Sequence, residues 1–190
     1  MARDADATRK NLVLAARRHF ASVGYERATV RAIAADADVN PALINRYFGG
    51  KEQLFAEAVS IDLAFPDLAD VPREAIGEAL VRHFFRRWEG DSHDDLLRVL
   101  VRTAATNPEA TERIRMIFSG QIVTLVKRLA GPEHAERRAA LVATQMLGLA
   151  YCRYVLGLPE AVLASDLAVP AIGETLQRYL FAPLDPQREG

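Results

Sequence analysis

The chain has 190 residues, of which 50% are hydrophobic and 26% charged, with a formal net charge of −1. A chain of this length can bury a sizeable core, and its proportions of hydrophobic and charged residues are ordinary for a globular protein. No run of ~18 apolar residues is present and no signal-peptide stretch opens the sequence, so we expect no membrane span and a cytoplasmic location. The single cysteine, Cys152, excludes a disulfide framework and a CxxC metal site.

Charge is divided unevenly along the chain. Residues 1–55 carry nine Lys/Arg and six Asp/Glu, whereas residues 56–190 carry fifteen and nineteen. A mildly basic N-terminal segment followed by an acidic remainder is typical of a chain in which only the N-terminal segment binds nucleic acid. Random placement of charges gives asymmetries of this size too, so this feature decides nothing alone.

Helical periodicity dominates the start of the sequence. The first helix is predicted to be capped by Asp6 or Thr8 and to end at Gly24. Thr29 is predicted to cap a short second helix, because its hydroxyl can accept a bond from a free amide of the first turn. The turn that follows contains Asp38, and aspartate tolerates the left-handed backbone that a tight turn needs.

A very short third helix is predicted at about 41–47. Asn40 is a good N-cap, Pro41 suits the first helical position, and the glycine pair at 49–50 stops the helix. A fourth helix is predicted from Lys51 to the break at Pro66.

The rest of the chain is also predicted to be helical. The expected segments lie near 73–89, 96–104, 109–129, 133–156 and 166–181. Residues 90–93 are expected to form a loop, with Asp91 or Ser92 as the next cap, and Pro170 would move the start of the last helix later. No alternating strand pattern appears, so the predicted fold class is all-α.

Two short helices joined by a turn, after a longer helix, predict a helix-turn-helix. Leu43 and Ile44 would hold the third helix against the first two, which leaves the side chains of its other face for the major groove. There Arg46 can pair with guanine and Asn45 with adenine. The pattern alone leaves two alternatives open, DNA binding and a helix pair of another kind.

The stretches GYERATVRAIA (24–34) and VNPALINRYFGGKEQLF (39–55) resemble the DNA-binding domain of the TetR family of transcriptional regulators. The second covers the family's recognition helix and the entry to its fourth helix. Two positions depart from the pattern: Asp38 stands where the family usually has glycine, and Gly49 replaces a commoner lysine, which removes one phosphate contact. Beyond about residue 60 the resemblance is one of length and helicity.

The resemblance implies a homodimeric repressor that binds a palindromic double-stranded DNA operator. The residues expected to contact phosphates are Thr29, Asn40, Tyr47 and Lys51, and those expected to face bases are Pro41, Ala42, Asn45 and Arg46. Residues 1–50 would form the DNA-binding domain, 51–182 a helical ligand-sensing and dimerisation domain, and 183–190 a frayed tail.

The homodimer is expected to form through the last two helices, about 134–156 and 171–181. Small residues there would let helices approach closely and leucines would supply apolar area: Ala139, Ala140, Ala143, Thr144, Gly148, Ala150, Leu141, Leu147, Leu149, Leu176 and Leu180.

A small apolar effector is expected to bind in the ligand-sensing domain. The fourth helix, which touches both domains, would transmit its effect to the DNA-binding domain. Its candidate pocket walls are Phe55, Val59, Phe84, Trp88, Met116, Gln121, Met146 and Tyr151, of which Gln121 and Tyr151 would orient the ligand. If these side chains only fill a core, the chain is a constitutive DNA-binding protein without an effector.

An enzyme is disfavoured by the motifs. There is no GxSxG, HExxH or dinucleotide-type glycine run, and Glu52 after Gly50-Lys51 excludes a P-loop. No cofactor or metal is expected, because the four histidines are scattered, and His83 is predicted to be a hydrogen-bonded packing residue. A helical adaptor remains the other alternative, and loss of DNA binding on altering Arg46 would separate the two.

Overall fold

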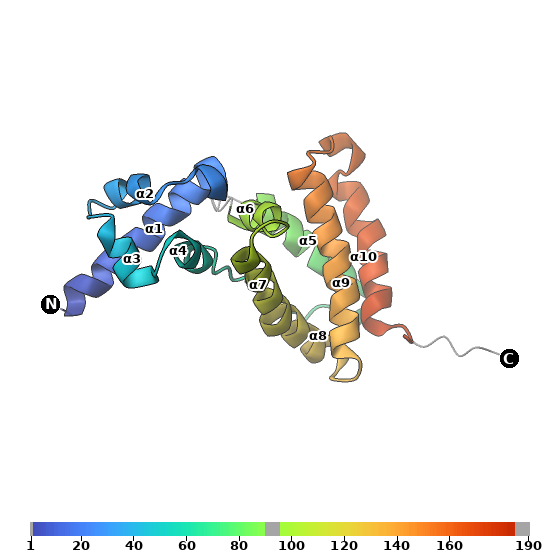
Figure 1. Cartoon of the computed structure of the whole chain (residues 1–190). Coiled ribbons are helices and arrows are strands. Elements are labelled where there is room, and N and C mark those ends of the chain that lie inside the picture. Colours follow the sequence, from blue (N-terminus) through green and yellow to red (C-terminus); the bar gives the residue numbers. More distant parts are fainter. Residues whose placement is uncertain (1, 90–95, 185–190) are drawn as a thin grey trace. The chain divides into compact units, whose positions relative to one another are not determined.

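The computed structural model describes residues 2–89 and 96–184, with side chains from residue 5 onward. The predicted loop at 90–93, its caps, and most of the predicted tail lie outside the described residues. Within them every regular element is helical and no strand occurs, which confirms the all-α fold class (Figure 1). No helix of the described part is both long and apolar enough to cross a membrane.

The α-helices are α1 (Ala2–Arg27), α2 (Val30–Asp36), α3 (Ala42–Phe48), α4 (Lys51–Ala58), α5 (Ile76–Glu89), α6 (Leu96–Thr103), α7 (Pro108–Ile117), α8 (Val123–Ala130), α9 (Ala135–Ala150) and α10 (Ser165–Phe181). The π-helical turns Phe118–Ile122 and Tyr151–Val155 continue α7 and α9, and the 3₁₀ turns Arg73–Ala75 and Glu160–Val162 precede α5 and α10.

The chain forms two compact units. The first holds Met1–Asp62 with His93–Arg115, and the second holds Leu63–Ser92 with Met116–Gly190. By packing, therefore, α4 and α6 belong with α1 to α3. The functional division into residues 1–50 and 51–182 stays a prediction.

The first unit is built on α1. Leu12, Ala15, Ala16 and Phe20 recur at helical spacing and are fully buried, as the sequence pattern predicts. The expected start at Asp6 or Thr8 is wrong, because the helix already begins at Ala2. The residues before Thr8 are mostly alanine and aspartate, which favour the interior and the first turn of a helix respectively.

Two glycines, Gly24 and Gly49, interrupt or end helices at the positions that the sequence predicts. Gly24 has a non-helical conformation (φ 78°, ψ 170°) that breaks α1 before its last turn. Gly49 adopts the left-handed conformation (φ 82°) that closes α3, and its amide donates to the carbonyl of Asn45.

The fourth helix is much shorter than predicted, because α4 ends at Ala58 and not at Pro66. Side chains from elsewhere satisfy the backbone beyond it. The amide of Leu63 donates to Gln121 Oε1 at 2.8 Å, and the Leu63 carbonyl lies 2.9 Å from His83 Nε2. The backbone of Leu63 therefore needs no hydrogen bonds within a helix. Because α4 ends at Ala58, the continuous helix that was expected to transmit movement between the two parts of the chain is not present.

The second unit packs α5 closely against α10, with α8 and α9 completing its core. The close approach occurs at two glycines. A Cβ atom on Gly77 would clash with the carbonyl of Gly173, and one on Gly173 would lie 2.8 Å from Glu78 Cγ. The amide of Gly77 also donates to Gln177 Oε1 at 2.9 Å.

Helix α10 begins at Ser165, so the expectation that Pro170 delays its start is wrong. Pro170 is the sixth residue of α10 and so lies beyond the amides of the first turn that have no intrahelical partner; it removes one backbone hydrogen bond, and the helix nevertheless continues through it to Phe181.

We predict that Gly77→Ala lowers the free energy of unfolding by about 1–3 kcal/mol, because the methyl group overpacks the contact between α5 and α10. Urea unfolding followed by circular dichroism measures this. Gly120→Ala is the matched control, since a Cβ there meets no atom within 4 Å. Equal stability of Gly77→Ala and wild type would contradict the packing argument.

Candidate nucleic-acid interface

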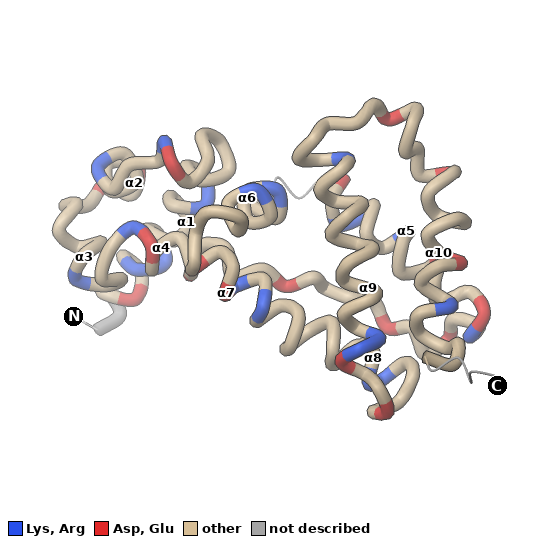
Figure 2. Tube along the Cα trace, turned by 45° about the vertical axis from the view of Figure 1, so that its right-hand side comes forward, with Lys and Arg blue, Asp and Glu red and all other residues tan. Residues whose placement is uncertain are grey.

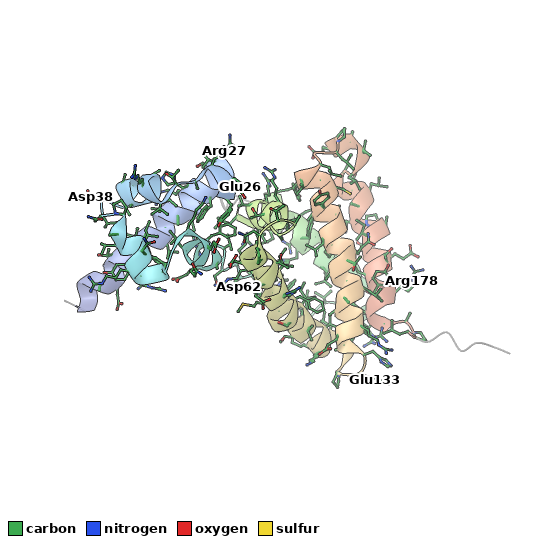
Figure 3. All side chains as sticks on the ribbon, in the orientation of Figure 1. Glu26, Arg27, Asp38, Asp62, Glu133 and Arg178 are labelled. Atoms are coloured by element: carbon green, nitrogen blue, oxygen red, sulfur yellow. The ribbon has the colours of Figure 1, made fainter. Side chains whose placement is uncertain are left out.

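Helices α2 and α3 are both capped at their N-termini by side chains, and the Asn40 cap lies in the turn that joins them. Thr29 Oγ1 accepts from the Ala32 amide at 3.1 Å, and Asn40 Oδ1 accepts from the Ala42 amide at 2.8 Å. Between them Asp38 has a positive φ of 53°, and its side chain projects outward in Figure 3. Both predicted caps and the predicted left-handed aspartate are confirmed, so the local sequence specifies this turn.

Helix α3 has one buried and one exposed face. Ile44 is fully buried and Phe48 is 8% exposed. Leu43 and Tyr47 are half-buried. The four residues that the sequence analysis expects at bases are all exposed: Pro41, Ala42, Asn45 and Arg46. The buried face therefore orients the helix and leaves those side chains available.

Several cations of the first unit are occupied by internal contacts. Arg18 forms a pair with Asp36 at 2.9 Å, Arg9 with Glu57, and Arg17 Nε donates to the carbonyl of Ala58 at 3.0 Å. These contacts tie α1 to α2 and to α4. Such arginines stabilise the unit and are poorly placed to serve phosphates.

Arg31, Arg46 and Lys51 lie in or beside the helix-turn-helix and make no ion pair within the described part of the chain, as is also true of Lys10, Arg27 and Arg102. Figure 2 marks basic positions on α2, α3 and α4. Arg31 is exposed in the first turn of α2, and the sequence analysis did not single it out. An arginine two positions after the Thr29 cap was the signal that could have found it.

Lys51 is half-buried at the start of α4. Its ammonium donates to the Glu26 carbonyl at 3.3 Å and lies 4.4 Å from the centre of the Tyr25 ring. The Arg46 guanidinium lies more loosely, 6.0 Å from the Tyr47 ring centre. Lys51 is therefore held in place, whereas Arg46 keeps the freedom to adjust to a base.

The predicted effector-pocket residues are divided between the two units. Phe55 and Val59 are fully buried in the first unit, where Phe55 packs against Phe20 and Tyr25. Met116 and Tyr151 are 52% and 46% exposed.

The remaining candidates lie in the second unit. Phe84, Trp88 and Met146 belong to or border its core, and Gln121 Oε1 accepts from Leu63. The side-chain oxygen of Gln121, which was expected to orient a ligand, therefore already accepts a hydrogen bond from the backbone.

A polar and aromatic cluster at Arg153 was not foreseen. The Arg153 side chain is only 8% exposed and pairs with Glu89 at 2.7 Å, while the Tyr154 hydroxyl donates to Glu89 at 2.8 Å. The Tyr154 ring stacks on Trp88 with centres 4.8 Å apart, so it covers one face of that candidate pocket wall. Burial, followed by the bond to Glu89, raises the pKa of Tyr154.

A hollow of the second unit has a volume of about 290 Å³. It is lined by the loop at 67–73, Ile76, Arg128 and Leu129, and it includes none of the predicted pocket residues.

No group of three potential metal ligands occurs among the described residues. His83, as expected, is hydrogen-bonded, and burial lowers its pKa so that it is neutral at pH 7.

Two family models match the chain. Residues 12–58 match the one described as bacterial regulatory proteins, tetR family, and residues 74–180 match the one described as tetracyclin repressor-like, C-terminal domain. Together they span both units.

Full-length relatives agree with these matches. The HTH-type transcriptional regulator BetI of Rhizobium meliloti (strain 1021) is 29% identical over 194 residues, covering 96% of this chain and 92% of its own. BetI of Agrobacterium fabrum is 31% identical, covering 85% of this chain and 83% of its own.

Solved structures show the same fold. A TetR-family regulator from Streptomyces coelicolor A3 is 28% identical with a TM-score of 0.56, covering 92% of this chain and 95% of its own. The multidrug binding protein EbrR, complexed with imidazole, is 21% identical with a TM-score of 0.67, covering 95% and 98%.

Proposed function

Because the chain belongs to the TetR family of DNA-binding transcriptional regulators, which are not enzymes, we propose that it is a repressor that binds a palindromic operator as a homodimer. The observation that carries the proposal is α3. In this helix a fully buried Ile44 fixes the orientation, and Asn45 and Arg46 are exposed on the helix that the Asn40 side chain caps.

The proposed DNA contacts divide into two classes. Thr29, Asn40, Tyr47 and Lys51 would meet phosphates, which position the protein, and Arg31 joins them because it is exposed beside the Thr29 cap. Pro41, Ala42, Asn45 and Arg46 would meet bases, which specify the sequence. The caps of Thr29 and Asn40 use one acceptor each, so the hydroxyl proton of Thr29 and the amide N–H groups of Asn40 can still donate to phosphate oxygens.

The homodimer is supported by an apolar face that the single chain leaves uncovered. Leu141 and Leu147 of α9 are 37% and 39% exposed, Tyr151 is 46% exposed, and Leu167 of α10 is 56% exposed. Ala140, Thr144 and Gly148 lie exposed between them and leave room for close approach.

Only part of the predicted dimer surface is available for this role. Six of its residues are buried in the chain's own core: Ala139, Ala143, Leu149, Ala150, Leu176 and Leu180. They were expected at the dimer face because the small residues and leucines of α9 and α10 suit helix packing, and the sequence does not say which face of each helix the chain itself covers.

A small, largely apolar effector is the remaining part of the proposal. The structural neighbour EbrR is described in complex with proflavin, at 20% identity to this chain. In this chain Gln121 holds Leu63, on the segment that leads from α4. A ligand that took the Gln121 amide would free that segment, and the ligand must bind the DNA-incompetent state more tightly to weaken DNA binding. Without such a ligand the protein is a constitutive DNA binder.

We predict that Arg46→Ala weakens operator binding by about 1–3 kcal/mol and relaxes the base preference at one position of each half-site. Lys51→Ala should weaken binding to all sequences alike and reduce the slope of log affinity against log salt by about one. Gel-shift titrations of the full chain at several salt concentrations measure both. Arg128→Ala, an exposed arginine of the second unit, is the control and should change neither; unchanged affinity and base preference in Arg46→Ala would exclude the assignment.

We predict that Leu147→Glu converts the dimer to a monomer, because two buried carboxylates would face the apolar surface of the partner. Light scattering at micromolar concentration reports the mass. Leu14→Glu is the control, because Leu14 is 50% exposed on α1, outside this face. A wild-type monomer, or an unchanged dimer in Leu147→Glu, would contradict the proposed interface.

We predict that small apolar molecules that raise the melting temperature of the full chain also release it from its operator. A thermal-shift screen followed by gel shifts with each binder checks this, and a 100-fold preference for the DNA-incompetent state corresponds to about 2.7 kcal/mol of coupling. Binders that stabilise the protein yet leave operator affinity unchanged would remove the switch from the account.

A further inference from the structure

A short apolar segment, residues 156–163, connects α9 to α10 and is exposed. Leu156, Leu158 and Val162 are 59%, 39% and 58% exposed, and Glu160 is the only charged residue of the segment. Large apolar side chains that gather on a surface in this way are typical of a binding site. The segment lies between α9 and α10 in Figure 1, at the end of this helix pair away from the C-terminus.

The segment is fixed by Arg153, which lies in the π turn that continues α9. The Arg153 side chain is 8% exposed, pairs with Glu89 of α5 at 2.7 Å and donates to the carbonyl of Leu163. It also pairs with Glu160 at 3.3 Å. A guanidinium has five N–H groups, so one side chain can tie the segment to α5 at two points. Because the segment is already ordered, binding a partner through it costs little conformational entropy.

The homodimer face proposed above needs more surface than its own large side chains provide. It exposes four of them: Leu141, Leu147, Tyr151 and Leu167. Together they offer roughly 350 Å², whereas a stable dimer buries ~800 Å² on each partner. The 156–163 segment adds roughly 280 Å² from its three apolar side chains. It is also continuous with the face, because it begins five residues after Tyr151 and ends four residues before Leu167.

The charges around the segment favour a second copy of the chain over a membrane. Peripheral attachment to an anionic membrane relies on lysines and arginines beside the apolar residues. The segment has no lysine or arginine of its own, and the neighbouring Arg153 is buried and paired with Glu89 and Glu160. In a two-fold dimer the same patch of both copies lies in one interface, so two such segments would meet without burying an unpaired charge.

We propose that residues 156–163 belong to the homodimer interface, where Leu156, Leu158 and Val162 pack on the second copy, and that Arg153 is the positioning residue that presents them. This inference rests on the proposed function, because it extends the face of α9 and α10 through which the homodimer forms. The two copies are then held by a segment outside both α-helices as well as by the helices themselves.

The first test is the dimer dissociation constant of the full chain, measured by sedimentation over a dilution series. Leu158→Ser and Val162→Ser should each raise this constant about tenfold, as expected when an apolar side chain is removed from a packed interface. Both side chains are exposed in the single chain, so neither change removes a core contact. Leu14→Ser is the matched control and should leave the constant unchanged, because Leu14 is 50% exposed on α1.

The second test addresses Arg153. Arg153→Gln should also raise the dissociation constant about tenfold, because the segment is no longer held. Combined with Leu158→Ser it should add much less than the two changes measured separately, since both remove the same contact. Circular dichroism checks that each variant is folded. Glu160→Gln changes a side chain that is 82% exposed, so it weakens the same tie without touching the core and should act in the same direction.

The outcomes separate this inference from the proposed function. A wild-type chain that stays monomeric at micromolar concentration overturns both. A wild-type dimer that Leu147→Glu breaks, but that Leu158→Ser and Val162→Ser leave as tight as before, overturns the role of the segment alone. Fully additive effects of Arg153→Gln and Leu158→Ser overturn the positioning role of Arg153, because a merely structural residue would act independently of Leu158.

Discussion

The burial of one face of α3 is the constraint on which the proposed site depends. A helix of seven residues has almost no stability of its own in water, so packing must supply its order. Ile44 is fully buried, Phe48 is 8% exposed, and the Arg9 guanidinium lies 5.1 Å from the Phe48 ring centre. These contacts fix the rotation of α3, and that rotation decides which side chains point outward.

The contacts around α3 also explain how arginines are divided between two tasks. Arg9 and Arg18 pair with Glu57 and Asp36, which fastens α1 to α4 and α2. Exposed pairs of this kind contribute little each, about 0.2–1 kcal/mol, but here they connect α1 to α2 and α4, which are too short to be stable alone. Arg31 and Arg46, without ion pairs among the described residues, remain for a partner of negative charge.

The helix-turn-helix could be predicted from the sequence because its determinants are local. Thr29 and Asn40 cap helices within three residues, and Asp38 and Gly49 adopt positive φ at the turn and the stop. The end of α4 could not be predicted, because Gln121, 58 residues away, satisfies the Leu63 amide. The stacking of Trp88 on Tyr154, 66 positions later, is likewise decided by tertiary packing, and no local pattern reveals it.

Residues 29–51 hold the proposed DNA contacts, and hydrogen–deuterium exchange tests this assignment most directly. The full chain would be compared with and without a DNA site selected by that chain from a random pool. The account predicts that DNA slows amide exchange within residues 29–51 and leaves the core of the second unit unchanged. Unchanged exchange throughout 29–51, with protection confined to the second unit, would contradict it.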